Sequence, residues 1–600
     1  MKLLPAALLS FSALLITACS DPAANNPELA SKNVNQLLDK QYDIRLQMSP
    51  IGLTAQGKTE RYHEWDDISG KGEERQQALR LQHLNELNAV ETGNLNKQTR
   101  LSLQLAKDGL QQEIDSYRWR HHDYPLSQMG GIHTTVADVL INQHKIANAA
   151  DAEAYISRLG RTQTLFDQMV QQLRTRQAKG VMPPAFVLQQ VVDASLNVIT
   201  GAPFDDGPDS PLLADFRNKV NALDIDTASK EDLIERASNT LKNVTFRAYS
   251  KLIAFVSAMQ RSADERAGIW KLPEGDAYYA HLLKLYTTTD MSADEIHELG
   301  LAEVKRIHSE MDKIRQQVGF EGDLQAFFEF FRTDPQFFYP NTDVGRAGFL
   351  KRSEDAIAAM KERLPEQFGI LPKADLVVKA VEPYREASAG IAFYERPALD
   401  GSRPGIYYTN LYDMNAMPNY QIDATAFHEA VPGHHMQIAI AQELTDLPEF
   451  RKFGGNTAYV EGWALYTELL AKEMGFYQDP YSDFGRLTLE LMRAIRLVVD
   501  TGMHSKQWTR EQAIQWFLDN GPNPKEEVVK EIERYMVIPG QATSYKIGML
   551  KILELRENAK AELGDKFDIR SFHDLILGNG PLPLTVLEQQ VNEWVAEQKG

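Results

Sequence analysis

Residues 424–437 spell Ala-Thr-Ala-Phe-His-Glu-Ala-Val-Pro-Gly-His-His-Met-Gln, and the rest of the chain can be interpreted around them. An apolar lead-in runs into a His-Glu pair, then a Pro-Gly step and two further histidines. Neutral imidazoles bind zinc, and a glutamate beside a ligand can take a proton from metal-bound water. The stretch therefore predicts a helix that carries a metal ligand, His428, and a general base, Glu429.

The histidine spacing departs from the helical form H-E-x-x-H, whose two histidines lie one turn apart. His434 and His435 follow His428 by six and seven residues. Seven residues on a regular helix advance about 10 Å along the axis, too far for two imidazoles to share one ion at ~2.1 Å. However, Pro432 and Gly433 both favour an interruption of the helix. If two residues loop out, His434 becomes the second ligand and His435 its neighbour or alternative. The other interpretation is a helix end with surface histidines.

A third ligand is expected from the mostly apolar segment 456–468, which contains Glu461 and Glu468. A carboxylate on an apolar helix is costly to bury unless it is paired or bound to metal. We predict that Glu461 is the third ligand. Glu468 is predicted to orient a histidine from outside the ligand shell, or to replace Glu461. Two histidines, a glutamate ligand and a glutamate base form the set found in thermolysin-type zinc peptidases.

Several segments resemble a bacterial family known as domain of unknown function 885. They are Tyr124-Pro-Leu-Ser-Gln-Met129, Leu272-Pro-Glu-Gly-Asp276, Thr287-Thr-Thr289, the octapeptide 428–435, Glu461-Gly-Trp-Ala464, and Arg534-Tyr535 with Pro539-Gly-Gln541. The likeness covers nearly all of the mature chain, and the octapeptide is its most specific part.

The resemblance implies a zincin-like, two-lobed helical peptidase with a deep cleft. Such a protein would be similar to the M3 oligopeptidases, the M32 carboxypeptidases and dipeptidyl peptidase III. The last of these carries one extra residue before its second histidine, so an expanded motif is compatible with zinc. The sequence departs from the thermolysin-type pattern at Leu465, where a carboxylate often follows the third ligand by four residues.

Length and charge limit the broad class. The 600 residues exceed one ordinary core and suggest two lobes, an N-terminal helical lobe over 33–270 and a catalytic lobe over 271–600. The chain has 64 Lys and Arg against 83 Asp and Glu, a net charge of −19. An acidic chain lacks the basic patches that nucleic acid requires, so no nucleic-acid partner is expected.

The N-terminus has the pattern of an export signal. Lys2 precedes an apolar run, residues 3–16, that is too short for an ordinary membrane-spanning helix. It ends in Thr-Ala-Cys19, which resembles a bacterial lipoprotein box, and Cys19 is the only cysteine in the sequence. We predict a signal peptide over 1–18, lipid attachment at Cys19 and a tether over 19–32. Ser20, rather than Asp, predicts the periplasmic side of the outer membrane. A plain secretory signal is the alternative.

The remaining pattern predicts a mainly α fold with a small β-sheet (α+β). Ser292-Ala-Asp-Glu295 is a capping box that opens a long amphipathic helix, and Gly319 is expected to close it. Strands are predicted at 375–382, 390–395 and 404–410. The third is a candidate edge strand that would pair with the substrate backbone, against the alternative of a purely structural strand. Its substrate-binding residues would be Ile406, Tyr407, Tyr408 and Asn410.

These features together predict a Zn²⁺-dependent metallopeptidase that hydrolyses short peptides. A tyrosine from a downstream segment would stabilise the oxyanion, with Tyr545 the first choice and Tyr535 the second. Arg493 and Arg496, in a predicted helix over 482–500, could meet a substrate carboxylate or could belong to a solvated face. One rival function is a zinc hydrolase of another amide or ester, such as a cell-wall fragment. The other is a non-catalytic lipoprotein that binds peptides or metal.

Overall fold

The computed structural model describes residues 26–600, apart from 383–385, 387–389, 399–400, 402 and 446. Across these residues the protein is mainly α-helical with two small sheets, which confirms the predicted fold class. The signal peptide and Cys19 lie outside the described residues. Within the described part of the chain, no helix is both long and apolar enough to cross a membrane.

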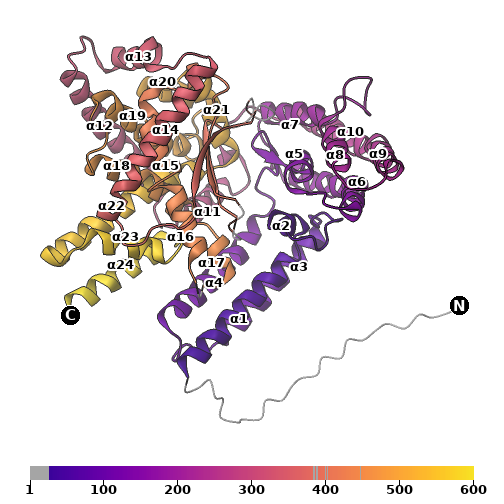
Figure 1. Ribbon diagram of the computed structural model, residues 1–600, viewed down its shortest axis with the longest axis horizontal. Helices are drawn as coiled ribbons and strands as arrows, with labels where there is room; N and C mark the ends of the chain where they lie inside the picture. The colour runs from indigo at the N-terminus through magenta and orange to yellow at the C-terminus, as the bar shows by residue number, and fades with distance from the viewer. Residues whose placement is uncertain (1–25, 383–385, 387–389, 399–400, 402, 446) are drawn as a thin grey trace.

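The N-terminal helices occupy the indigo and purple side of Figure 1. They are α1 (Pro27–Leu46), α2 (Pro50–Ala55), α3 (Gly70–Asn88), α4 (Lys97–Ser116), α5 (Ile132–Asp138), α6 (Ala149–Ala178), α7 (Ala185–Val198), α8 (Pro211–Asn221), α9 (Thr227–Thr240) and α10 (Phe246–Gln260), with a hairpin of β1 (Leu126–Ser127) and β2 (Gly130–Gly131). One hydrophobic cluster, spanning Trp65 to Met259, holds most of them together.

The tether predicted over 19–32 is wrong from Pro27 onward, where α1 begins. Asn26 caps this helix by accepting hydrogen bonds from the backbone N–H groups of Glu28 and Leu29 at 3.1 and 3.2 Å. Pro27 fits the first helical position, because the backbone donor it lacks would have no partner inside the helix. The folded body therefore starts at least six residues before the predicted end of the tether.

The C-terminal part contains most of the longer helices and the second sheet. Its elements are α11 (Gly275–Thr287), α12 (Ala293–Gln317), α13 (Leu324–Thr333), α14 (Asp343–Arg363), β3 (Leu376–Ala380), β4 (Ala392–Glu395), β5 (Gly405–Thr409), α15 (Ile422–Glu429), α16 (His434–Glu443), α17 (Glu449–Phe453), α18 (Thr457–Glu473), α19 (Pro480–His504), α20 (Arg510–Asn520), α21 (Lys525–Val537), α22 (Ser544–Leu563), α23 (Ile569–Gly578) and α24 (Leu584–Lys599).

The two parts share apolar packing. The main C-terminal core also takes in Leu101, Trp119 and Val181 from the N-terminal part. Arg451 adds a polar link, because its Nη1 donates to the Ser102 hydroxyl at 3.0 Å. The boundary predicted at residue 270 stays a prediction, and these contacts tie α4 closely to the second part.

The three-stranded sheet has the order β3-β5-β4, with β5 parallel to β3 and antiparallel to β4. All five residues of β5 are buried. The predicted edge strand is therefore wrong, because β5 lies in the centre of the sheet and both of its backbone edges are already paired. Ile406, Tyr407 and Tyr408 cannot offer their backbone to a peptide, and Asn410 follows the strand, donating its own N–H to Ile391.

Candidate metal centre

The predicted interruption of the His-Glu helix is present and is larger than expected. Helix α15 ends at Glu429, residues 430–433 form a turn, and α16 begins at His434. Thus four residues leave the helix, where two were predicted. Gly433 fits the turn because a Cβ there would come within 1.9 Å of the His428 carbonyl oxygen. The turn brings the second histidine back beside the first.

His428, His434 and Glu461 converge on one point. Each offers one ligand atom, and these atoms all lie within 4.8 Å of one another. The Nε2 atoms of His428 and His434 lie 3.6 and 3.5 Å from Oε2 of Glu461. Tetrahedral coordination with bonds of ~2.1 Å separates neighbouring ligand atoms by about 3.4 Å. The spacing and the donor set therefore fit a zinc ion. No other group of this kind occurs within the described ranges.

Glu468 supports the first histidine, as its predicted orienting role requires. Its Oε1 lies 2.8 Å from Nδ1 of His428, and the Glu468 side chain is 1% exposed. This contact places a proton on Nδ1 and leaves Nε2 to face Glu461. The sequence left open which of the two glutamates is the ligand. In the structure, Glu461 lies at the cluster and Glu468 lies behind His428.

The charges of the cluster are strongly coupled. Burial lowers the pKa of His428, but hydrogen bonding to Glu461 and Glu468 outweighs this and raises it to about 9. Burial also acts to raise the pKa of the Glu461 carboxyl, yet the two imidazoles hold it well below its usual value. Both shifts show that the carboxylates favour positive charge at this point of the structure.

His435 does not join the cluster. Its Nδ1 lies 3.0 Å from the Tyr394 hydroxyl and its Nε2 lies 3.1 Å from the Ala374 carbonyl oxygen. The side chain is buried, and burial lowers the pKa of His435 to about 4. His435 therefore fixes α16 to the sheet, and the alternative in which it replaces His434 as a ligand is not supported.

Glu429 is the last residue of α15 and adjoins His428, as the predicted base should. It is 9% exposed. Its carboxylate lies near enough to contribute to the raised pKa values of His428 and Tyr407, although burial is the larger cause for Tyr407. Tyr407 thus neighbours the site through its side chain, even though its backbone belongs to the centre of the sheet.

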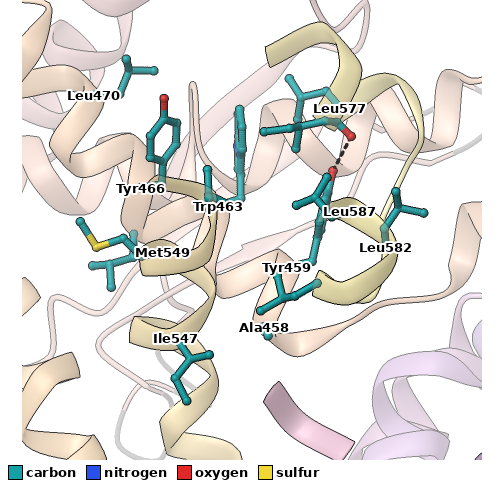
Figure 2. Close-up of a cluster of buried hydrophobic side chains, with 14 of the residues drawn as sticks. Ala458, Tyr459, Trp463, Tyr466, Leu470, Ile547, Met549, Leu577, Leu582 and Leu587 are labelled. Atoms are coloured by element: carbon teal, nitrogen blue, oxygen red, sulfur yellow. Dashed lines mark hydrogen bonds between the residues drawn. The ribbon is translucent and has the colours of Figure 1, made fainter. Parts of the chain in front are cut away.

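The helices α18 and α22 pack closely against each other. Figure 2 shows apolar side chains from both helices, Tyr459 and Met549 among them, in one buried cluster. A Cβ on Gly462 would lie 2.5 Å from Gly548, and one on Gly548 would lie 1.8 Å from the Ala458 carbonyl oxygen. This crossing brings Tyr545, on the first turn of α22, near Glu461. The Glu461 carboxylate adds to burial in raising the pKa of Tyr545.

Tyr535, the second candidate for stabilising the oxyanion, is unsuited to that role. It is 1% exposed. Its hydroxyl donates to Glu531 and accepts from Nε of Arg496 at 2.8 Å. Because both functions of the hydroxyl are already used, Tyr545 is the better candidate.

Trp463 is a positioning residue that sequence reasoning missed. Its indole N–H donates to the Pro432 carbonyl oxygen at 2.9 Å, which ties α18 to the turn between the two histidines. Thr467 makes a second tie, from its hydroxyl to the Phe427 carbonyl at 3.2 Å. The sequence does indicate that a buried tryptophan N–H needs a hydrogen-bond acceptor, but it does not identify the Pro432 carbonyl as that acceptor.

A cavity of about 310 Å³ opens beside Glu461. Its lining includes Arg396, Gln437, Lys452 and Asn456. A space of this size beside the cluster can hold a small part of a ligand.

Fold and site together define a mainly α-helical protein whose His-His-Glu cluster is built by a broken helix and a neighbouring helix. The chain belongs to the bacterial protein family of unknown function DUF885, whose model matches residues 50–591. This confirms the family predicted from the sequence. Neither the description of this family nor those of the two similar structures below name a peptidase, so the expected likeness to zinc peptidases stays a prediction.

Two solved structures are similar to this chain. A protein from Colwellia psychrerythraea has a TM-score of 0.88 and 32% identity, with 95% of this chain and 99% of that chain covered. A protein from Shewanella oneidensis has a TM-score of 0.73 and 20% identity, with 93% and 99% covered, and shows the fold alone. Both are described as a "putative lipoprotein", the second of unknown function. No curated protein matches the chain.

Proposed function

We propose that the protein is a zinc-dependent metallopeptidase that acts on short peptides. The observation that carries the proposal is the approach of two imidazole Nε2 atoms to the Glu461 carboxylate at 3.5 and 3.6 Å, with Glu429 adjoining one of the ligands. The His428 and His434 side chains are only 5 and 10% exposed. Such limited access favours short, unfolded peptides over folded proteins.

His428, His434 and Glu461 would hold the ion, and zinc would polarise the scissile carbonyl and acidify a water molecule. Glu429 takes the proton from the attacking water and passes it to the leaving amine. The peptide C–N bond breaks, the acyl carbon gains the water oxygen, and the amine gains the proton. Tyr545 donates its phenolic hydrogen toward the carbonyl oxygen as negative charge develops there.

The presence of Glu429 and Tyr545 favours an enzyme over a binding protein. Metal or peptide binding needs neither a carboxylate next to a ligand nor a phenol near Glu461. The same residues would serve hydrolysis of another amide or an ester, so that rival is an outcome of the substrate test below.

The test is a digest of a synthetic peptide library by the zinc-loaded mature chain, read by mass spectrometry beside elemental analysis. We expect about one zinc per chain, cleavage of short peptides, loss of cleavage with a chelator and recovery on adding zinc. Failure to bind any transition metal after incubation with zinc would contradict the proposal. Cleavage of cell-wall amides or esters, with no peptide cleaved, would favour the rival hydrolase.

We also propose that Cys19 is lipidated and anchors the protein at the periplasmic side of the outer membrane. Support comes from the lipobox-like end of the signal, the lone cysteine and the description of the similar Colwellia psychrerythraea structure. Cys19→Ser should abolish labelled-lipid incorporation and release the protein from the membrane fraction. Unchanged labelling and fractionation would refute the anchor.

A further inference from the structure

A group of arginines lies around Tyr545. Arg493 and Arg496 are on α19, and Arg534 is on α21. The guanidinium carbon of Arg496 lies 4.6 Å from the ring centre of Tyr545, and that of Arg493 lies 6.0 Å from it. Tyr545 is also close enough to Glu461 for that carboxylate to affect its pKa. The arginines and the cluster thus border the same tyrosine.

Two of these arginines have donors that the fold leaves unused. Arg496 donates through Nε to Tyr535 at 2.8 Å and through Nη2 to Glu531 at 2.9 Å, while its Nη1 has no partner among the described residues. Arg493 donates through Nη1 to the Leu489 carbonyl at 3.2 Å, and its buried Nε has no partner there either. A buried donor without an acceptor costs about 1–3 kcal/mol.

Positive charge also exceeds negative charge in this group. Glu531 is the carboxylate shared by Arg496 and Arg534, at 2.9 and 3.1 Å. The nearby Glu527 has its pKa raised to about 7 by burial, so it carries only part of a charge near neutral pH. By contrast, the buried Arg486 on the same helix bonds to two carboxylates, Asp483 and Glu490. The arginine group therefore carries an excess of positive charge that one more anion would balance.

A carboxylate is the anion that these donors fit, because a guanidinium presents parallel N–H groups to its two oxygens. Behind Arg496 the structure is closed, since Tyr535 and Glu531 bond directly to it and Tyr535 is 1% exposed. A peptide that reached Arg496 could not continue on that side, which favours a chain end there over an internal segment.

We propose that Arg493 and Arg496 bind the free C-terminal carboxylate of a peptide whose scissile bond lies at the His428-His434-Glu461 cluster. The protein would then release a short fragment from the C-terminus. This inference rests on the proposed peptidase function and adds the direction of cleavage to it. The bond change is the hydrolysis described above, with the new amine on the released C-terminal fragment.

The test compares matched short peptides that end in a free acid or in an amide, using the zinc-loaded mature chain. Wild type should cleave the free acids at least 10-fold faster in kcat/KM. Arg493→Gln should lower kcat/KM for the free acids by ~10- to 100-fold, mainly through KM, and should lower it much less for the amides. Arg493→Lys should recover part of the loss, because it restores charge without the forked donors.

Arg261→Gln is the matched control. Like Arg493, Arg261 donates from Nη1 to a carbonyl four residues earlier, that of Ser257, at 3.3 Å, but it is exposed and follows the last residue of α10. It should behave as wild type. Arg493→Gln must also keep its zinc content and melting temperature, and Arg496→Gln gives a second reading of the same loss.

The possible failures are distinct. Equal cleavage of acids and amides by wild type, at internal bonds, would overturn the C-terminal inference and leave the peptidase proposal standing. Cleavage of amides that depends on an acidic side chain at the same position would show that the arginines recognise a side chain, which also overturns it. No cleavage of any peptide by zinc-loaded protein would overturn both.

Discussion

Removal of the Glu468 carboxylate tests how the site holds its first ligand. Glu468→Ala deletes the partner that lies 2.8 Å from Nδ1 of His428. Both side chains are almost completely buried, at 1 and 5% exposure, so solvent has little access to replace the lost acceptor. The imidazole can then carry its proton on Nε2, the nitrogen that faces Glu461, and that tautomer cannot bind a metal through Nε2.

The size of the effect follows from this geometry. Loss of a partner behind a ligand typically costs 10- to 100-fold in metal affinity, or ~1.4–2.7 kcal/mol. A similar cost, about 1–3 kcal/mol, applies to a buried donor left without an acceptor. Glu461→Ala should cost more, because it removes one of the three ligand atoms. The expected order of zinc affinity is therefore wild type, Glu468→Ala, Glu461→Ala.

A competition titration against a chromophoric zinc chelator measures these affinities. Glu473→Ala is the control, because Glu473 lies on the same helix and pairs with Arg556 at 2.7 Å, away from the cluster. It should bind zinc like wild type. The reasoning is refuted if Glu468→Ala binds zinc as tightly as wild type, or if it binds more weakly than Glu461→Ala.

Three further changes test the turn, the choice of histidine and a buried acid. Gly433→Ala places a methyl group 1.9 Å from the His428 carbonyl oxygen, so we expect a lower melting temperature and weaker zinc binding. Gly455→Ala is the control, because a Cβ there meets nothing within 4 Å. Equal behaviour of the two variants would contradict the role of the turn. By elemental analysis, His434→Ala should lose its zinc while His435→Ala keeps most of it, and the opposite result would move the ligand. Burial raises the pKa of Asp500 from 3.8 to about 7, so the folded state keeps this proton to a higher pH than the unfolded state. The contribution of the protonated Asp500 to the free energy of unfolding is complete below about pH 4 and is lost as the pH rises to 7. The free energy of unfolding of Asp500→Asn should therefore increase relative to that of wild type over this range, by up to ~4 kcal/mol. Denaturant unfolding at several pH values would show no such trend if the acid titrates normally.

Local patterns predicted much of the fold. Ser292 and Glu295 form the expected capping box, and Gly319, with φ of +70°, follows the helix they open. The predicted strands at 375–382, 390–395 and 404–410 correspond to β3, β4 and β5. These features depend on residues close in sequence, where capping, turn chemistry and hydrophobic period are visible.

The pairing of the strands could not be obtained in the same way. β5 lies between β3 and β4, although it follows both in sequence. A strand buried on both faces and paired on both edges has the same short apolar pattern as other buried strands. The start of α1, unlike the strand pairing, could be predicted, because Asn26, Pro27 and Glu28 are standard signals for a helix N-terminus. The tether was predicted instead from the composition of the segment.

The sequence allowed the site residues to be predicted where their chemical type alone identifies them. His428, His434 and Glu461 were chosen because zinc needs nitrogen and carboxylate ligands, and the structure brings these three together. The order of Tyr545 and Tyr535 could not be decided from sequence. It depends on the Gly462–Gly548 crossing and on the bonds that Tyr535 makes to α19 and within α21.

The most direct test of the account is Glu429→Gln, measured for zinc stoichiometry and for peptide hydrolysis on the same sample. Glutamine keeps the shape of the side chain but cannot accept the proton from water. We predict zinc content near that of wild type and a rate lower by ~10²- to 10⁴-fold. Full activity in Glu429→Gln would contradict the assignment of Glu429 as the general base, and loss of zinc would show that Glu429 holds the metal instead.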